Sequence, residues 1–254
     1  MNKRDYIGEI LSKKSRLYHA GQRWDKMAVR LGDIRSSQTF LADALEACEA
    51  FKYDHHIPDN VELTPMMEAL ERASINDDSQ AEISRYFPIA LIACIEGYFR
   101  LVFADLINHG SPYKENASKF DIKFTIDTAI SLEKHSVSLG EFVAHLLPLN
   151  NLEDINANMS TLMGESFLAQ FKKKRAETAT QLHLFPTSDE EIDARIIGII
   201  KRLFEKRHMY CHELYPPVTD SDDSFFLKSD NGASDAAIEF LWVSEAGVKE
   251  LIAS

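Results

Sequence analysis

The chain has 254 residues, of which 45% are hydrophobic and 27% are charged, with only 10 glycines and 8 prolines. This composition is typical of a folded globular protein and excludes collagen-like, low-complexity and wholly disordered chains. The 28 basic and 40 acidic side chains give a net charge of −12, which argues against a protein that coats nucleic acid with its whole surface. A basic site confined to one part of this acidic molecule remains compatible with the charge.

The cysteines and the apolar segments indicate the compartment. Cys48, Cys94 and Cys211 form no CxxC pair and are too few for a disulfide framework, which favours a reducing compartment. The first residues lack the charged, apolar and small-residue pattern of a signal peptide. The longest apolar stretch, Phe87 to Ile95, is far shorter than a bilayer is thick. We therefore expect a cytoplasmic protein with no membrane partner.

Helical periodicity dominates the chain, and few segments resemble strands. We expect two or three helices in the first third, a loop from Tyr53 to Pro65, a break at Asn76–Ser79 and then a long helix, roughly Gln80 to Asn108. This helix carries an apolar stripe too wide for a solvated face, which predicts a central helix of a bundle. The stripe consists of Ile92, Ile95, Phe99, Val102, Phe103 and Leu106.

Shorter elements follow the long helix. Glu141 to Leu147 and Leu152 to Lys173 are predicted as amphipathic helices. The basic run 172–175 is expected at a helix end, where positive side chains complement the helix dipole. After an acidic loop at 220–223, we expect a short helix or a pair of strands from Ala236 to Ile252.

The clearest element is a helix from Asp189 to Leu214. Ser188 and Glu191 have the spacing of a capping box, basic residues crowd the far end, and Pro216–Pro217 terminates the element. Its apolar residues recur every three or four positions, and this seam runs into Arg207, where an apolar core residue is expected. The full seam is Ile192, Ile196, Ile199, Leu203, Arg207, Tyr210 and Leu214.

A guanidinium at a core-facing position needs a partner, because an unpaired buried charge is very costly. The stem of Arg207 can instead pack on the core while its head reaches solvent near the helix end. Glu96 lies on the apolar stripe of the long helix and would pair with Arg207 if the two helices touch. Glu96 would then be either a structural partner or a residue that orients Arg207 at a site.

Two chemistries are open for the residues around Arg207. His208 and His212 are four residues apart, so they share a helix face with Glu205 one turn earlier, an acceptable geometry for a divalent metal. No fourth ligand is visible, and the second histidine of a zincin motif is absent. Alternatively, Arg207 and His212 are suited to cleaving RNA without metal. Histidine would transfer the protons, and arginine would hold the phosphate.

This late motif resembles that of the HEPN superfamily (higher eukaryotes and prokaryotes nucleotide-binding domains). Ribonuclease members of this all-α family carry an arginine, four to six spacers and a histidine, commonly with a polar residue after the arginine. Arg207, His208 and His212 match that pattern with four spacers. The long helix with Glu96 is similar to an early family helix that carries a buried acidic residue. The resemblance covers roughly residues 84–217.

The resemblance implies a metal-independent endoribonuclease that needs no cofactor, acting in toxin or antiviral defence. Its partners would be RNA, a second copy of the chain, and an antitoxin or sensor protein. On a straight helix Arg207 and His212 point roughly 140° apart, so they converge only if the helix kinks or ends between them or if they meet across a dimer. The resemblance implies the dimer, in which the motifs of two protomers share one cleft. His208 and Glu96 would be supporting residues of that cleft.

The resemblance does not extend to the tyrosine that a partner protein modifies in some members of the family. The modified tyrosine lies two residues after the histidine, a position that Leu214 occupies, and Tyr215 is one residue late.

We therefore expect an all-α, HEPN-like helical bundle at 84–217, an N-terminal helical extension at 1–83 and a short C-terminal extension packed on the bundle at 218–254. A competing hypothesis is a non-catalytic HEPN-like bundle that binds RNA, a nucleotide or a protein through the same residues. A third is a metal-dependent hydrolase that uses Glu205 and the two histidines.

Overall fold

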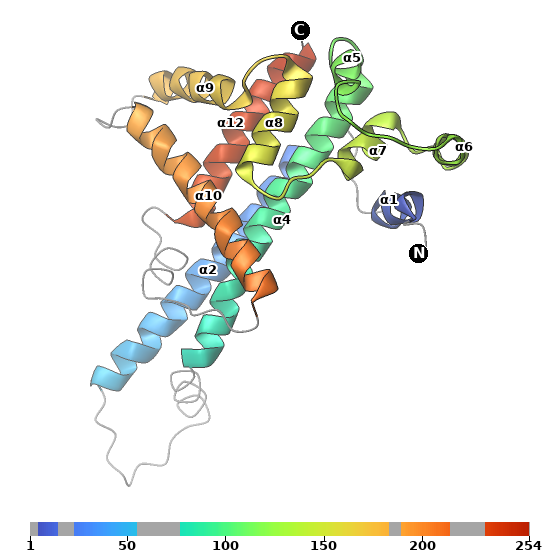
Figure 1. Cartoon of the computed structure of the whole chain (residues 1–254). Helices are drawn as coiled ribbons and strands as arrows, with labels where there is room; N and C mark the ends of the chain where they lie inside the picture. Colours follow the sequence, from blue (N-terminus) through green and yellow to red (C-terminus); the bar gives the residue numbers. More distant parts are fainter. Residues whose placement is uncertain (1–4, 15–22, 55–76, 183–188, 214–231, 254) are drawn as a thin grey trace.

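The structure is a computed structural model that describes residues 5–14, 23–54, 77–182, 189–213 and 232–253. These ranges contain ten α-helices and no β-strand, so the predicted all-α class is confirmed (Figure 1). The helices are α1 (Tyr6–Lys14), α2 (Arg23–Asp54), α4 (Asp77–His109), α5 (Tyr113–Ala117), α6 (Ile126–Lys134), α7 (Leu139–Leu146), α8 (Leu152–Met163), α9 (Phe167–Leu182), α10 (Asp189–His212) and α12 (Ala233–Ala253).

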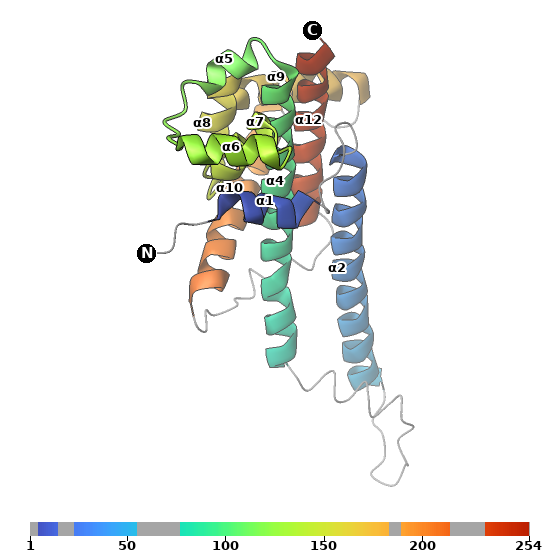
Figure 2. The ribbon, with the colours of Figure 1, turned by 90° about the vertical axis from the view of Figure 1, so that its right-hand side faces the viewer.

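Helix α4 is the axis of the molecule, with α2, α7, α10 and α12 packed around it (Figures 1 and 2). All six residues of its predicted apolar stripe are fully buried, which confirms it as the central helix. Among the described residues, Ser84–His109 is the one segment long and apolar enough to cross a membrane, but most of it is buried in the bundle. A core helix of a soluble bundle has the same length and composition, so this property does not indicate a membrane.

In the described residues before α4, the chain forms two helices, α1 and α2. α2 runs without a break through Ser36–Ser37, where the Ser37 hydroxyl donates to the Asp33 carbonyl. It continues to Asp54, the second residue of the predicted loop, and residues 55–76 lie outside the described part. α2 runs antiparallel to α4, and the two helices lie side by side (Figure 2).

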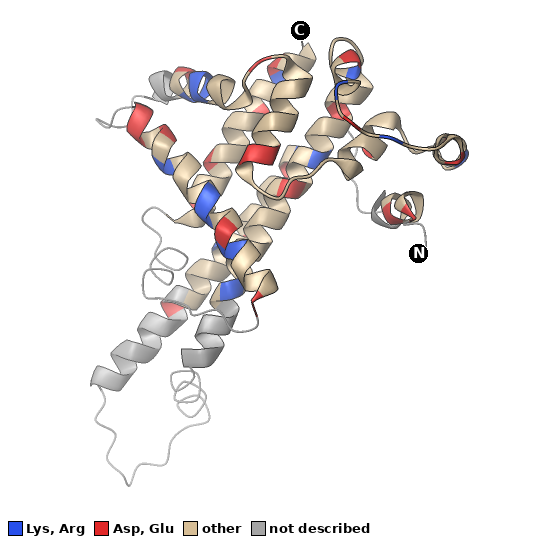
Figure 3. Ribbon diagram, viewed as in Figure 1, with Lys and Arg blue, Asp and Glu red and all other residues tan. Residues whose placement is uncertain are grey.

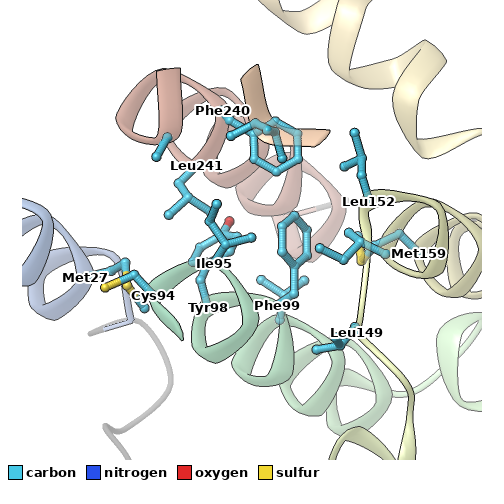
Figure 4. Packing of buried hydrophobic residues seen from close by; sticks show 14 of the residues in the cluster. Met27, Cys94, Ile95, Tyr98, Phe99, Leu149, Leu152, Met159, Phe240 and Leu241 are labelled. Carbon is cyan, nitrogen blue, oxygen red and sulfur yellow. The ribbon is translucent and has the colours of Figure 1, made fainter. Parts of the chain in front are cut away.

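The C-terminal segment forms one long helix of 21 residues, α12, so the alternative of a strand pair was wrong. Its buried residues include a series spaced by three or four positions, Ala237, Leu241, Ser244 and Val248, which is a helical period. Phe240 and Leu241 pack over Ile95 and Phe99 of α4 (Figure 4). The ring centroids of Phe99 and Phe240 are 5.8 Å apart.

The segment from Leu152 to Lys173 is two helices and not the single helix predicted. Gly164 ends α8 in the left-handed conformation, with φ of 79°, which a glycine adopts without strain. The basic run 172–175 consequently lies in the middle of α9 and not at a helix end as predicted. Its last member, Arg175, is buried and pairs with Asp193 of α10, so it is a core ion pair and not a solvated charge.

Helix α7 confirms the element predicted at Glu141–Leu147, with slightly different ends. It begins with a capping box formed by Ser138 and Glu141, whereas the capping box predicted at Ser188 falls outside the described residues. Gly140 allows α7 to approach α4 closely, because a Cβ at this position would lie 2.4 Å from the Ala104 carbonyl oxygen. The short helices α5 and α6 were not predicted.

Candidate functional site

The predicted contact between Arg207 and Glu96 is present. The second half of α10 crosses α4 (Figure 1), which brings Arg207 Nη2 to 3.6 Å from Glu96 Oε1. This distance is an ion pair, longer than a good hydrogen bond. The side chain of Arg207 is 30% exposed and that of Glu96 is 21% exposed. The arginine is therefore neither buried in the core nor fully solvated. It combines the two predicted environments, a guanidinium paired with a carboxylate and a side chain whose head reaches solvent.

A second arginine, Arg100 on the same helix, acts electrostatically on Glu96 without forming an ion pair with it. Burial raises the pKa of Glu96, while Arg207 and Arg100 act in the opposite direction. Burial also lowers the pKa of Arg100, and Glu96 opposes that shift. Two guanidinium groups around one carboxylate leave a local charge of +1 in a chain whose net charge is −12.

The donors of Arg100 are engaged in the fold. Its Nη1 donates to the carbonyl oxygens of Ala144 at 2.6 Å and His145 at 3.2 Å, at the end of α7. Among the described residues, Glu96 is the one ion-pair partner of Arg207. Sequence reasoning missed Arg100, although its position four residues after Glu96 places both on one face of α4.

His208 and His212 lie side by side on the last turns of α10, both exposed. Their ring centroids are 4.6 Å apart with an interplanar angle of 49°. α10 continues as one α-helix to His212, so the helix does not end between Arg207 and His212. Within one chain these two side chains therefore point roughly 140° apart, and His208 is the neighbour of His212.

The three-residue metal site proposed for Glu205, His208 and His212 is not formed. Among the described residues, no group of three or more His, Cys, Asp or Glu side chains lies close enough to hold a metal ion. The reason is helical geometry, because Glu205 and His212 are seven residues, or about 10 Å, apart along the axis. The metal-dependent hydrolase hypothesis loses its ligand set.

The end of α10 is basic within an acidic protein. Residues 201–207 carry four positive charges, on Lys201, Arg202, Lys206 and Arg207, and one negative charge, on Glu205. Lys201 is paired with Glu153 at 2.6 Å, and Figure 3 shows residues of both signs along the second half of α10. Lys206 Nζ lies 5.9 Å from the centroid of the Tyr210 ring, within reach of a cation–π interaction. Leu214 and Tyr215, the positions relevant to control by tyrosine modification, lie outside the described residues.

A second cluster of charged residues was missed by sequence reasoning and lies inside the bundle. Arg23 donates to Glu245 from Nε at 2.9 Å and from Nη2 at 3.1 Å, and to Asp105 at 2.5 Å. The Tyr98 hydroxyl donates to Glu245 at 3.0 Å, and burial raises the pKa of Tyr98 well above its ordinary value. These residues come from α2, α4 and α12, so no local pattern could have linked them.

Comparison with known proteins adds no relative: no family model, curated protein or solved structure matches this chain. The resemblance to the HEPN superfamily therefore rests on the residues of the chain itself, above all Arg207, His208 and His212.

Proposed function

We propose that the chain is a metal-independent endoribonuclease of HEPN type, acting as a homodimer in toxin or antiviral defence. The observation that supports this most is the position of Arg207. It is partly exposed, lies 3.6 Å from a carboxylate that Arg100 also influences electrostatically, and sits on the same helix end as two exposed imidazoles. A positive charge that is held in place but not fully neutralised is suited to a phosphate.

In the proposed reaction, His212 accepts the proton of a ribose 2′-hydroxyl as its oxygen attacks the adjacent phosphorus. The bond from phosphorus to the 5′-oxygen breaks, and that oxygen takes the proton from the imidazolium of His212. The products are a 2′,3′-cyclic phosphate and a 5′-hydroxyl. Arg207 donates to the non-bridging oxygens and offsets the charge that develops on the phosphorane. Histidine suits both proton transfers because its ordinary pKa lies near neutrality.

The continuous α10 helix makes the second protomer necessary to the proposal. Since Arg207 and His212 face different directions on one helix, an arginine of one copy would meet the histidine of the other across a two-fold axis. His208, in contact with His212, would supply a hydrogen bond to the substrate. Glu96 would act as a positioning residue for Arg207.

The first test is cleavage of RNA by the purified protein in excess EDTA, with His212→Ala and Arg207→Ala as variants. We expect cleavage to survive chelation, to leave cyclic-phosphate ends and to fall by about 10²–10⁴-fold in each variant. His135→Ala is the matched control, because His135 is an exposed histidine directly after α6, and Figure 1 shows α6 well away from α10. Full activity of His212→Ala would contradict the proposal.

Mixing the two inactive variants tests the shared cleft. A mixed dimer of Arg207→Ala and His212→Ala protomers contains one complete site if the pair is formed across the interface, so activity should return on mixing. If the pair belonged to one chain, no mixture would recover. RNA binding without any cleavage would instead support the non-catalytic module.

A further inference from the structure

The outward face of α2 carries a regular stripe that the bundle does not cover. Its positions are separated alternately by three and four residues, the spacing of the a and d positions of a coiled coil. All six are exposed, and the two apolar members, Val29 at 63% and Phe40 at 75%, are conspicuously so. The stripe consists of Lys26, Val29, Asp33, Ser36, Phe40 and Asp43.

This outer stripe is distinct from the inner face of α2, which packs on the core. The inner face contains the buried residues Arg23, Met27, Leu31, Ile34 and Gln38. A helix that is apolar only toward its own core needs no exposed valine and phenylalanine at coiled-coil spacing on the opposite side. The position of the stripe therefore suggests a contact outside the bundle.

We infer that the outer stripe of α2 docks antiparallel on the same stripe of a second copy of the chain. A two-fold axis between positions 34 and 35 places Val29 opposite Phe40 and Lys26 opposite Asp43, each pair occurring twice. Asp33 then lies opposite Ser36, which can donate a hydrogen bond to it. Apolar residues meet apolar residues, and opposite charges meet at both ends of the contact.

The charges also select this register over its neighbours. Sliding one helix by a heptad in one direction places Val29 opposite Asp33, which buries a carboxylate against an apolar group. Sliding it the other way places Asp33 opposite Asp43, where like charges repel. The inferred register is the one of the three that satisfies both the apolar and the charged positions.

The contact is small and separate from the candidate RNA site. The stripe spans 18 residues, roughly 27 Å of helix, with two apolar side chains per copy. Such an interface lies at the low end of specific contacts, so it should form reversibly and at high concentration. Figure 2 shows α2 and α10 on opposite sides of α4, so this docking leaves the end of α10 uncovered.

Cross-linking in solution tests the register directly. In a Cys48→Ser, Cys211→Ser background, Val29→Cys and Phe40→Cys proteins are treated with a short bismaleimide, separately and mixed. In the inferred register residues 29 and 40 are adjacent across the axis, whereas identical positions are 11 residues, or about 16 Å, apart. We expect a covalent dimer in the mixture and little in either protein alone. Equal cross-linking in all three samples, or none in the mixture, would overturn the inference.

Charge reversal gives an independent measurement. Sedimentation velocity from about 1 μM to about 500 μM should show that Lys26→Asp or Asp43→Lys weakens self-association and that the double variant restores it. Phe40→Glu should abolish the α2 contact, while Ile126→Glu, at an 80% exposed residue of α6, should not. A double variant as weak as the single ones would count against the charge pairing. These measurements contain no RNA, and the proposed catalytic dimer is assayed separately by mixing its inactive variants.

Discussion

Two arginines approach the central helix α4 from opposite sides, and their surroundings differ sharply. Arg23, on α2, is 4% exposed and bonds to two carboxylates at 2.5–3.1 Å. Arg207, on α10, is 30% exposed and approaches Glu96 no closer than 3.6 Å. A guanidinium has five N–H donors in a fixed geometry. The donors of Arg23 are directed into the fold, whereas those of Arg207 can reach a ligand.

The pKa shifts follow the same division. Burial by itself would lower the pKa of Arg23, but Glu245, Tyr98 and Asp105 raise it above its ordinary value. Arg23 thus has two carboxylate partners, Glu245 and Asp105, while the single carboxylate of Glu96 is influenced by two arginines. The first arrangement stabilises a cation inside the protein. The second leaves a surplus positive charge at a partly exposed position, as an anion-binding site requires.

The largest effect on stability is expected at Arg23. Arg23→Ala removes the nearest cation from the buried Glu245, which keeps only the longer ion pair to Lys249 at 3.8 Å, and from its neighbour Asp105. The free energy of unfolding should therefore fall by about 3–5 kcal/mol. Urea denaturation measures this change. Arg35→Ala is the control, because Arg35 pairs with Asp235 at 3.0 Å but is 54% exposed, and it should cost less than about 1 kcal/mol. Equal losses of unfolding free energy in Arg23→Ala and Arg35→Ala would show that the burial of the Arg23 cluster does not add to its contribution.

A smaller loss of stability is expected at Arg100. Like Arg23, and unlike Arg207, this arginine directs its donors into the fold. Arg100→Met keeps much of the side-chain volume but removes the donors to the carbonyl groups at the end of α7, which should cost about 1–3 kcal/mol. Relative to wild type, amide hydrogen exchange in this variant should accelerate more in α7 than in α12. A loss confined to α12 would show that Arg100 does not hold the end of α7.

The sequence predicted the all-α class, the central helix and its stripe, because these depend on local periodicity. It also predicted the pairing of Glu96 with Arg207, since each interrupts an apolar seam and each needs a partner. It did not predict the Arg23 cluster, because Asp105 and Glu245 are 82 and 222 residues from Arg23 along the chain. Long-range polar contacts of this kind leave no periodic signal.

Two predictions were wrong for local reasons that the composition did not reveal: the single helix at Leu152–Lys173 and the possible strand pair at Ala236–Ile252. The left-handed Gly164 divides a segment whose apolar pattern continues on both sides, so the pattern alone predicted one helix. The small residues of α12, such as Ala237 and Ser244, gave a weak hydrophobic period although both are buried. Small side chains permit close helix packing in the interior, and their burial depends on neighbours that a single segment does not reveal.

Arg207→Ala should separate stability from activity. Because both members of its ion pair are partly solvated, we expect a change of less than about 1 kcal/mol in the free energy of unfolding. In the proposed reaction the same variant loses most of its cleavage. Urea denaturation and the RNA assay on one preparation provide both values. A stability loss as large as that of Arg23→Ala would mean that Arg207 is a structural residue after all.

The smallest effect is a pH dependence at Glu96. Its pKa is raised in the fold because burial disfavours the carboxylate more than the two arginines favour it. Between the ordinary glutamate pKa and the raised pKa, the folded state keeps a proton that the unfolded state has lost. The stability that protonated Glu96 contributes is therefore full below the ordinary pKa and is lost as pH rises through the raised pKa. Glu96→Gln cannot titrate, so the stability of wild type relative to this variant should decline from about pH 4 toward neutrality. Arg207→Ala removes a group that lowers the pKa of Glu96, so it should make the decline steeper. Urea denaturation across this pH range measures both slopes. A constant difference in stability between wild type and Glu96→Gln would show that Glu96 titrates normally. The burial of Glu96 would then have no electrostatic consequence for the site.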